Sequence, residues 1–361
     1  MIWHDKRNQF GSPAAEAEKR TYLASIVCDN HLSLVMLQVR MLLRIPTVLR
    51  SQELIDKAFS RASRIEEPYY PDKVERIRKE VQDRISTIES ISRSFLDRLV
   101  KKFPSINNLH PFYSSLIDLM FDIDQYKISL SKIDRTSQMI EQISGEHIRR
   151  LKAAKTVEDA NRIMRSYYGR FASLVHEIDQ DLLFLGRCRD YMKKIPDIDV
   201  NLRTYIIAGM PNVGKSSLLA ALTTKKPEIA PYPFTTKSVI IGIAEHGYER
   251  IQFIDTPGIL DRDFDEMNQI EKNAVLALRH IKGTVIFLFD YSDQSLYDPE
   301  MQEHLYQQIR DHINPNIIRV QTKMDISREK REKIAISVNT EGGLDPLKAI
   351  IFGRTDDDVR G

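Results

Sequence analysis

The stretch Gly209-Met-Pro-Asn-Val-Gly-Lys-Ser216 spells GxxxxGKS, the pattern of a phosphate-binding loop. An apolar run at 205–208 precedes it and a helix-forming run at 217–222 follows it, so the motif lies between an expected strand and an expected helix. The glycines let backbone N–H groups turn toward phosphate oxygens, and the N-terminal end of the helix faces the same anion. The pattern predicts that Lys215 contacts the β- and γ-phosphates and that the Ser216 hydroxyl is a Mg²⁺ ligand.

The rest of this half of the chain alternates short apolar strands with helices. Strands are expected at 204–209, 238–244, 251–255, 284–290, 317–321 and 334–338. Alternating strands and helices predict a six-stranded, mostly parallel sheet with helices on both faces, an α/β P-loop domain. Ligands of such sheets bind beyond the C-terminal ends of the strands.

The N-terminal half reads as nearly continuous amphipathic helix. Ser51 is expected to cap one helix, and apolar residues at steps of three and four then predict helices over 72–103, 111–121, 124–151 and 157–194. Short turns between long helices predict an all-α antiparallel bundle. We therefore expect an N-terminal extension at 1–44, a helical bundle domain at 45–196 and a P-loop domain at 197–361, with 195–200 as the linker or docking strap.

Composition excludes several classes of protein. The formal net charge of the 361 residues is +2, which gives no overall basic footprint for nucleic acid. The two cysteines, Cys28 and Cys188, cannot form a disulfide framework, and residues 1–7 lack the basic-then-apolar order of a signal peptide, so a reducing, cytoplasmic location is expected. The most apolar early segment, 32–43, is short and interrupted by Arg40, which argues against a membrane partner.

A second motif, Asp255-Thr-Pro-Gly258, follows the strand expected at 251–255. In P-loop NTPases an acidic residue at this position holds Mg²⁺, and the Gly258 N–H can contact a γ-phosphate. Residues 231–236 include Phe234, Thr235 and Thr236, and a threonine hydroxyl in this position can ligate Mg²⁺ in the triphosphate state.

A third motif, Thr322-Lys-Met-Asp325, ends the strand expected at 317–321. The Asp325 carboxylate would accept hydrogen bonds from guanine N1–H and the 2-amino group. Adenine lacks that pair of donors, so Asp325 indicates GTP rather than ATP. The stem of Lys323 would cover the base plane. Ser337 and Val338, at the end of the last strand, are expected to contact the base through their backbone.

At this point the chain resembles the nucleolar GTP-binding protein (Nog) family of Obg-related GTPases. The resemblance covers roughly residues 42 to 352, and its motifs lie at 209–217, 231–238 and 255–261 in the GTPase half and at 45–48, 54–63 and 110–113 in the helical half. It implies a GTP-hydrolysing switch in large ribosomal subunit assembly, with a helical domain that docks on the precursor particle. Mg²⁺ and GTP or GDP are the implied cofactors, and a monomer is expected.

The resemblance also assigns residues. It favours Thr236 over Thr235 as the Mg²⁺ ligand beside Ser216 and Asp255. Asn212 matches an asparagine that ligates K⁺ in related GTPases, although here it could equally serve only to shape the loop. Lys215, Thr236, Gly258 and Asn212 form the expected catalytic set. The expected nucleotide contacts are Gly209, Pro211, Asn212, Val213, Gly214, Lys215, Ser216, Ser217, Phe234, Thr235, Thr236, Asp255, Gly258, Thr322, Lys323, Asp325, Ser337 and Val338.

Three departures from the family pattern bear on function. Residues 1–41 match no recognised segment, Thr322 stands where the family has asparagine, and a long C-terminal extension does not follow, which favours an archaeal-type short form. Ile259 follows Gly258 where many GTPases have a water-orienting glutamine, so slow intrinsic hydrolysis and an external activator are expected. Two other functions stay open: a GTP-regulated binding scaffold with negligible turnover, and an Obg-related GTPase acting on another RNA or a stress-signalling partner.

Overall fold

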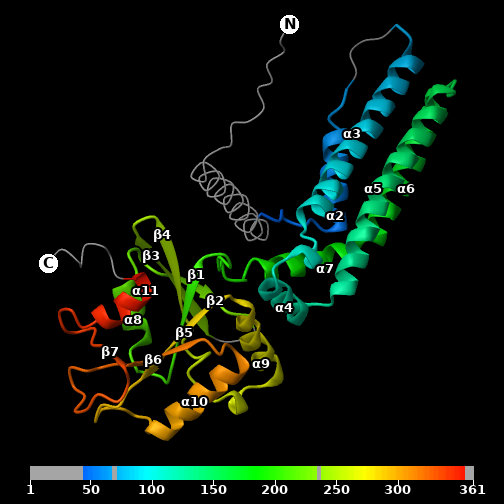
Figure 1. The fold of residues 1–361 in the computed structure, drawn as a ribbon. Helices are drawn as coiled ribbons and strands as arrows, with labels where there is room; N and C mark the ends of the chain where they lie inside the picture. The colour runs from blue at the N-terminus through cyan, green and yellow to red at the C-terminus, as the bar shows by residue number, and fades with distance from the viewer. Residues whose placement is uncertain (1–43, 67–70, 234–236, 354–361) are drawn as a thin grey trace, which may run out of the picture.

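The structure, a computed structural model, describes residues 44–66, 71–233 and 237–353. A helical bundle occupies the first part of this chain and an α/β layer the second (Figure 1). Within the described residues, no helix is long and apolar enough to cross a membrane.

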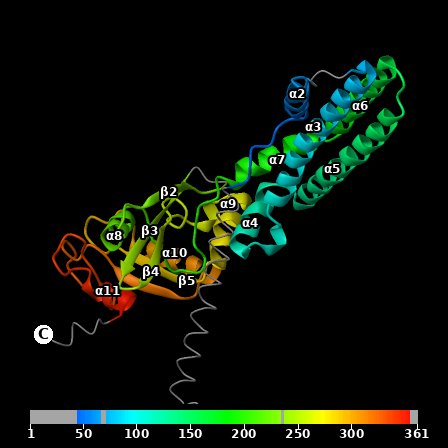
Figure 2. The ribbon, with the colours of Figure 1, turned by 90° about the horizontal axis from the view of Figure 1, so that it is seen from above.

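The bundle is built on long helices that project away from the sheet, as both ribbon views show (Figures 1 and 2). Its helices are α2 (Ser51–Ala62), α3 (Lys73–Lys102), α4 (Pro111–Met120), α5 (Ile123–Lys152), α6 (Val157–Glu177) and α7 (Asp179–Met192), with the 3₁₀ turn η1 (Ile106–Asn108) before α4. The stripe expected on α3 is confirmed, because Val81, Ile85, Ile88, Phe95 and Leu99 are all buried. The Asp72 side chain caps that helix by accepting from Val74 N at 2.8 Å.

Two sequence expectations for the bundle are wrong. Ser51 is the first residue of α2 rather than its cap, and the helix expected at 157–194 is broken at Ile178. One side chain contacts both of these segments. The Asp179 carboxylate accepts hydrogen bonds from Ser51 N at 3.1 Å and Ser51 Oγ at 2.8 Å, and it pairs with Arg50. These contacts join residues about 130 positions apart, which a local pattern cannot reveal.

The α/β layer contains a seven-stranded sheet in the order β2-β3-β4-β1-β5-β6-β7. The strands are β1 (Arg203–Ala208), β2 (Glu228–Pro231), β3 (Ser238–His246), β4 (Glu249–Asp255), β5 (Gly283–Phe289), β6 (Ile317–Gln321) and β7 (Ile334–Ala335). β1, β4, β5, β6 and β7 are mutually parallel along the sheet, whereas β3 is antiparallel to both β2 and β4. The expected mostly parallel sheet is confirmed, but the count of six strands is wrong.

The strand missed by the sequence is β2. Only Ala230 of its four residues is buried, so the segment lacks the apolar alternation that indicates a strand, and it ends in Pro231 at the sheet edge. Helices α8 (Lys215–Leu222) and α11 (Asp345–Phe352) lie on one side of the sheet, and α9 (Gln269–Leu276) and α10 (Pro299–His312) lie on the other (Figure 1). The 3₁₀ turns η2 (Phe264–Glu266) and η3 (Ala277–His280) flank α9.

The two halves share one continuous core. The strap at 195–200 buries Ile195, Ile198 and Val200, and the Tyr113 hydroxyl of α4 donates to Ile198 O at 2.5 Å and accepts from Ile198 N at 3.2 Å. Helix α4 also packs against η3 and α9 of the α/β layer. The bundle is therefore fixed to the sheet through α4 and the strap.

The contact between Asp179 and Ser51 generates a stability prediction. Asp179→Ala should lower the free energy of unfolding by about 1–3 kcal/mol at neutral pH, because it leaves the Ser51 N–H and the Arg50 guanidinium without their acceptor. The hydrogen bond from Arg50 holds the pKa of Asp179 well below its usual range. The stabilisation is therefore fully present above about pH 4, the ordinary pKa of an aspartate, and is lost as the pH falls further. Urea unfolding at several pH values measures this, with Asp190→Ala on the same helix as the control, since the Asp190 side chain is 65% exposed.

Candidate nucleotide site

The loop between β1 and α8 is shaped by glycines that no other residue could replace. Gly209 has φ +133°, and a Cβ there would lie 2.6 Å from Leu288 O of β5. Gly214 has φ +101° and precedes α8. Asn212 also has a positive φ, +64°, and is exposed at the tip of the loop. The backbone is thus pressed against β5 and turned to present the N-terminus of α8.

Lys215 folds back over this loop. Its Nζ donates to Gly209 O at 2.8 Å and Met210 O at 2.9 Å, and its side chain is 6% exposed. Burial lowers the pKa of Lys215, while the nearby Asp261 and Asp255 carboxylates oppose that shift. The ammonium group is therefore held in place by carbonyls before any phosphate approaches.

Ser216 and Asp255 form a pair that fits a Mg²⁺ ion. The Ser216 hydroxyl donates to Asp255 Oδ2 at 2.6 Å, and Asp255 Oδ1 is buried with no hydrogen-bond partner among the described residues. Burial raises the pKa of Asp255, while the hydrogen bond from Ser216 and the charge of Lys215 oppose that shift. Mg²⁺ in nucleotide sites is held by one or two protein oxygens together with waters and phosphates. The third predicted ligand, Thr236, lies outside the described residues with Phe234 and Thr235.

No group of three or more His, Cys, Asp or Glu side chains in the described part of the chain could hold a metal ion by itself. The two oxygens of Ser216 and Asp255 therefore need phosphate and water to complete an octahedral shell.

The segment after β4 carries the second predicted phosphate contact. Gly258 has φ +73°, and its N–H donates to Asp261 Oδ2 at 2.7 Å. The same Asp261 oxygen lies 3.5 Å from Lys215 Nζ. Ile259 is 1% exposed, so it faces the core and cannot orient a water molecule. The sequence indicated roles for Gly258 and Ile259 but none for Asp261, which connects the segment after β4 to Lys215 of the phosphate loop.

The predicted base-reading residues gather at the ends of β6 and β7. Asp325 Oδ1 accepts from Ser337 Oγ at 2.8 Å and Oδ2 accepts from Asn339 Nδ2 at 3.0 Å. These hydrogen bonds, that from Asn339 first, lower the pKa of Asp325 and keep it ionised. Asn339 was not predicted to contact this carboxylate, although it lies two residues after Ser337.

Thr322 and Lys323 connect the base region to the rest of the site. The Thr322 hydroxyl donates to Val213 O in the phosphate loop at 2.9 Å. Lys323, with φ +56°, pairs its Nζ with Asp290 Oδ2 at 2.7 Å at the end of β5. Thr322 thus has a bridging role that the sequence did not indicate. Val338 is 38% exposed beside Ser337.

Every described residue of the predicted site lies at the C-terminal ends of the parallel strands β1, β4, β5, β6 and β7. Lys215, Ser216 and Asp255 lie near the middle strands, and Asp325 lies toward β7. Three functional candidates were missed: Asp261, Asp290 and Asn339. Each lies within or next to a motif, but hydrogen bonds between distant loops define their roles.

Comparison with known proteins agrees with this geometry. Residues 43–199 match the family model of the NOG1 N-terminal helical domain, and residues 204–323 match that of the 50S ribosome-binding GTPase. Nucleolar GTP-binding protein 1 of Candida glabrata is 35% identical and covers 84% of this chain, with 48% of its own length matched. The protein of the same name from Saccharomyces cerevisiae is 35% identical (83% of this chain, 48% of that protein), and that of Arabidopsis thaliana is 32% identical (81% and 45%).

The chain spans about half the length of the curated relatives it matches. These relatives are named for the nucleolus, which contradicts the cytoplasmic location expected from the sequence. That expectation rested on cysteine usage and on the missing signal peptide. Neither feature separates the cytoplasm from the nucleus, because both are reducing and neither is reached by a secretory signal.

The similarity to these relatives runs through the helical half and the nucleotide-binding half alike, and the motifs it covers are those that build the site. The chain belongs to the nucleolar GTP-binding protein family, in which a helical domain precedes a P-loop GTPase domain.

Proposed function

We propose that this protein is a GTP-binding and GTP-hydrolysing switch that acts in assembly of the large ribosomal subunit. The observation that carries the proposal is the single sheet edge on which Lys215, the Ser216–Asp255 pair and Asp325 lie together. Lys215, Ser216 and Asp255 would bind the triphosphate and its Mg²⁺, and Asp325 would bind the guanine base. The residues between them, Thr322 and Val213, connect the two ends through one hydrogen bond.

The roles follow from the donors and acceptors present. Lys215 Nζ would contact the β- and γ-phosphates, the Gly258 N–H would contact the γ-phosphate, and the backbone of 209–217 would surround the β-phosphate. Ser216, Asp255 and Thr236 would hold Mg²⁺, whose charge neutralises the phosphates when it is bound. Asp325, kept ionised by Ser337 and Asn339, would accept from guanine N1–H and the 2-amino group.

Hydrolysis by the isolated protein should be slow, on the order of 10⁻⁴ s⁻¹, as for an unaided switch. The buried Ile259 supplies no group that could position water. This observation also favours the second candidate function, a GTP-regulated scaffold with negligible turnover. Phosphate release can be measured after ribosomal fractions are added. A fraction that accelerates it would support the switch, and no acceleration by any fraction would support the scaffold.

The helical domain is proposed as the docking element, with domain limits of 45–196 and 197–361. A switch needs a route from the nucleotide to the docking surface. Tyr232, just before 234–236, is 1% exposed and its hydroxyl donates to Ala274 O of α9 at 2.8 Å. Helix α9 packs against α4 of the bundle. A shift of the segment that contains Thr236 would therefore reach α4 through α9.

Asp325→Asn tests the nucleotide. The amide presents a donor to guanine's own donors, so GTP affinity should fall by about two orders of magnitude or more, while xanthosine nucleotides, with a carbonyl at C2, should gain affinity. Competition titrations against a fluorescent nucleotide measure both. Unchanged GTP affinity in this variant would remove Asp325 from base recognition.

Asn212 generates a prediction about potassium. If its side chain helps to hold K⁺ between the β- and γ-phosphates, replacing sodium by potassium should raise the hydrolysis rate, and Asn212→Ala should abolish that increase. Asn212→Gly is the matched control for the loop, because glycine accepts the positive φ of +64°. Equal rates in the two salts would leave Asn212 with a purely structural role.

A fragment of residues 44–200 tests the docking proposal. It keeps Ile198, whose backbone is bonded to Tyr113, and it should be helical by circular dichroism. We expect it to sediment with large-subunit precursors without nucleotide, whereas residues 201–361 should bind poorly. The near-neutral net charge predicts a shallow salt dependence, with few phosphates neutralised. Binding carried wholly by residues 201–361 would make the bundle a regulatory cap instead.

A further inference from the structure

Asp261 occupies a position between the two donors assigned to the γ-phosphate. Its Oδ2 accepts a hydrogen bond from Gly258 N at 2.7 Å and lies 3.5 Å from Lys215 Nζ. The residue is 8% exposed, so this carboxylate is enclosed within the site rather than solvated at its rim. Neither the phosphate-loop motif nor the Asp-Thr-Pro-Gly motif assigns it a role.

We propose that Asp261 is a specificity-determining residue that competes with the terminal phosphate of GTP and so biases the site toward GDP. The inference rests on the proposed function, because it takes Lys215 and Gly258 as the γ-phosphate contacts. A carboxylate and a phosphate cannot share the same two donors at short range without strong repulsion in an enclosed site. A diphosphate reaches Lys215 through its β-phosphate but does not extend to the Gly258 N–H, so Asp261 keeps the hydrogen bond from Gly258 when GDP is bound.

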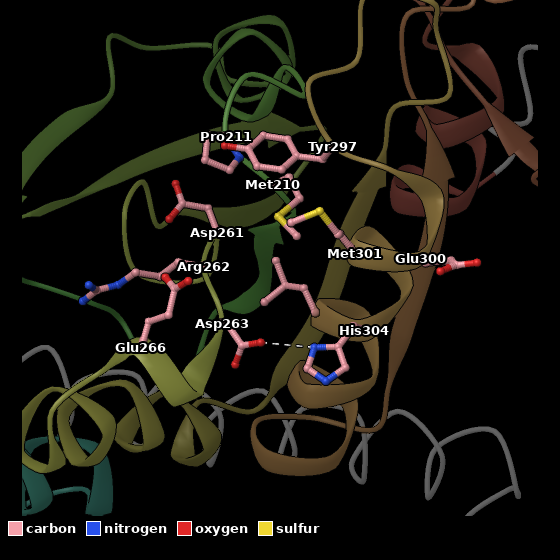
Figure 3. A pocket seen from close by; sticks show the side chains of 11 residues that line it. Met210, Pro211, Asp261, Arg262, Asp263, Glu266, Tyr297, Glu300, Met301 and His304 are labelled. Carbon is pink, nitrogen blue, oxygen red and sulfur yellow. Dashed lines mark ion pairs between the residues drawn. The ribbon is translucent and has the colours of Figure 1, made fainter.

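GTP would therefore bind only after Asp261 moves, and the structure provides space for that movement. Asp261 borders a pocket of ≈ 560 Å³ that also contains Met210, Tyr297 and Leu305 (Figure 3). Figure 3 shows Asp261 beside Pro211, with Arg262 and Asp263 continuing along the same segment. Rotation of the side chain into this pocket would release both donors without unfolding the loop.

The lining of the pocket makes the displaced position unfavourable. Asp263, Glu266 and Glu300 also line it, so a further carboxylate that enters the pocket meets negative charge. Arg262, which also lines the pocket, already pairs with Glu271 at 3.2 Å, and the His304 ring lies 3.2 Å from Asp263. The free energy needed to move Asp261 would therefore weaken the binding of GTP and leave the binding of GDP unchanged.

A purely structural role for Asp261 makes a different prediction. The turn is already held by Ile259 N and Leu260 N, which donate to Thr256 O at 3.0 and 3.3 Å. If Asp261 only added rigidity to this turn, its removal would change GDP and GTP binding by the same factor.

The test compares affinities of the full chain for Mg²⁺–GDP and for a Mg²⁺-bound, non-hydrolysable GTP analogue by calorimetric titration. Asp261→Asn removes the charge and retains the shape, and it should raise the preference for the triphosphate by about tenfold, which corresponds to 1.4 kcal/mol. Asp261→Glu, which keeps the charge, should leave the preference near that of the unaltered protein. Asp265→Asn is the matched control, with the same change of charge on a side chain that is 84% exposed.

An equal change in both affinities for Asp261→Asn, or the same shift for Asp261→Glu, would overturn the inference. Asp261→Ser gives the same comparison if thermal melting shows that the amide variant does not fold. Failure of the unaltered protein to bind either nucleotide would overturn the proposed function itself, which separates the two conclusions.

Discussion

Parallel pairing of β1 between β4 and β5 is the constraint on which the site depends. The register pairs Ile207 with Asp255, the last residue of β4, and with Ile286 of β5, so the C-terminal ends of β1 and β4 lie side by side and β5 continues only to Phe289. The phosphate loop, the Asp255 segment and the loop after β5 must then emerge together. The close approach of Gly209 to Leu288 O presses the phosphate loop against β5. Lys215 returns over the loop and is fixed by two of its carbonyls, so the phosphate contact is organised by the fold before nucleotide binds.

The same sheet also connects the nucleotide to the helical domain. Helix α9 lies between the two, because its Ala274 carbonyl accepts from the Tyr232 hydroxyl and the helix also packs against α4. The strap at 195–200 forms a second connection through Tyr113 and Ile198. Two fixed contacts of this kind hold the α/β layer and the bundle in one arrangement. Independent domains on a flexible linker would not require buried tyrosines at both points.

Much of this could be predicted from the sequence, and what could not has a physical explanation. The fold class and most of the long helices follow from helical periodicity, and the strands β1, β4 and β5 follow from short continuous apolar runs that are buried on both faces of the sheet. β2 was not predicted because only one of its residues, Ala230, is buried. The break at Ile178 was not predicted either, and the neighbouring Asp179 accepts a hydrogen bond from Ser51, which is far away in the chain. The motifs located the phosphate and base ends of the site. They could not reveal Asp261 or Asn339, because those roles exist only when separate loops meet.

The central claim is that the buried Lys215 ammonium is the organising phosphate contact. Calorimetric titration with Mg²⁺–GDP tests it most directly, using the unaltered protein, Lys215→Ala and the control Lys225→Ala, whose side chain is 68% exposed and paired with Glu245. The account predicts measurable binding by the unaltered protein and the control, and a loss of at least about tenfold, or 1.4 kcal/mol, for Lys215→Ala when circular dichroism shows it to be folded. Equal GDP affinity in folded Lys215→Ala and the unaltered protein would contradict the account.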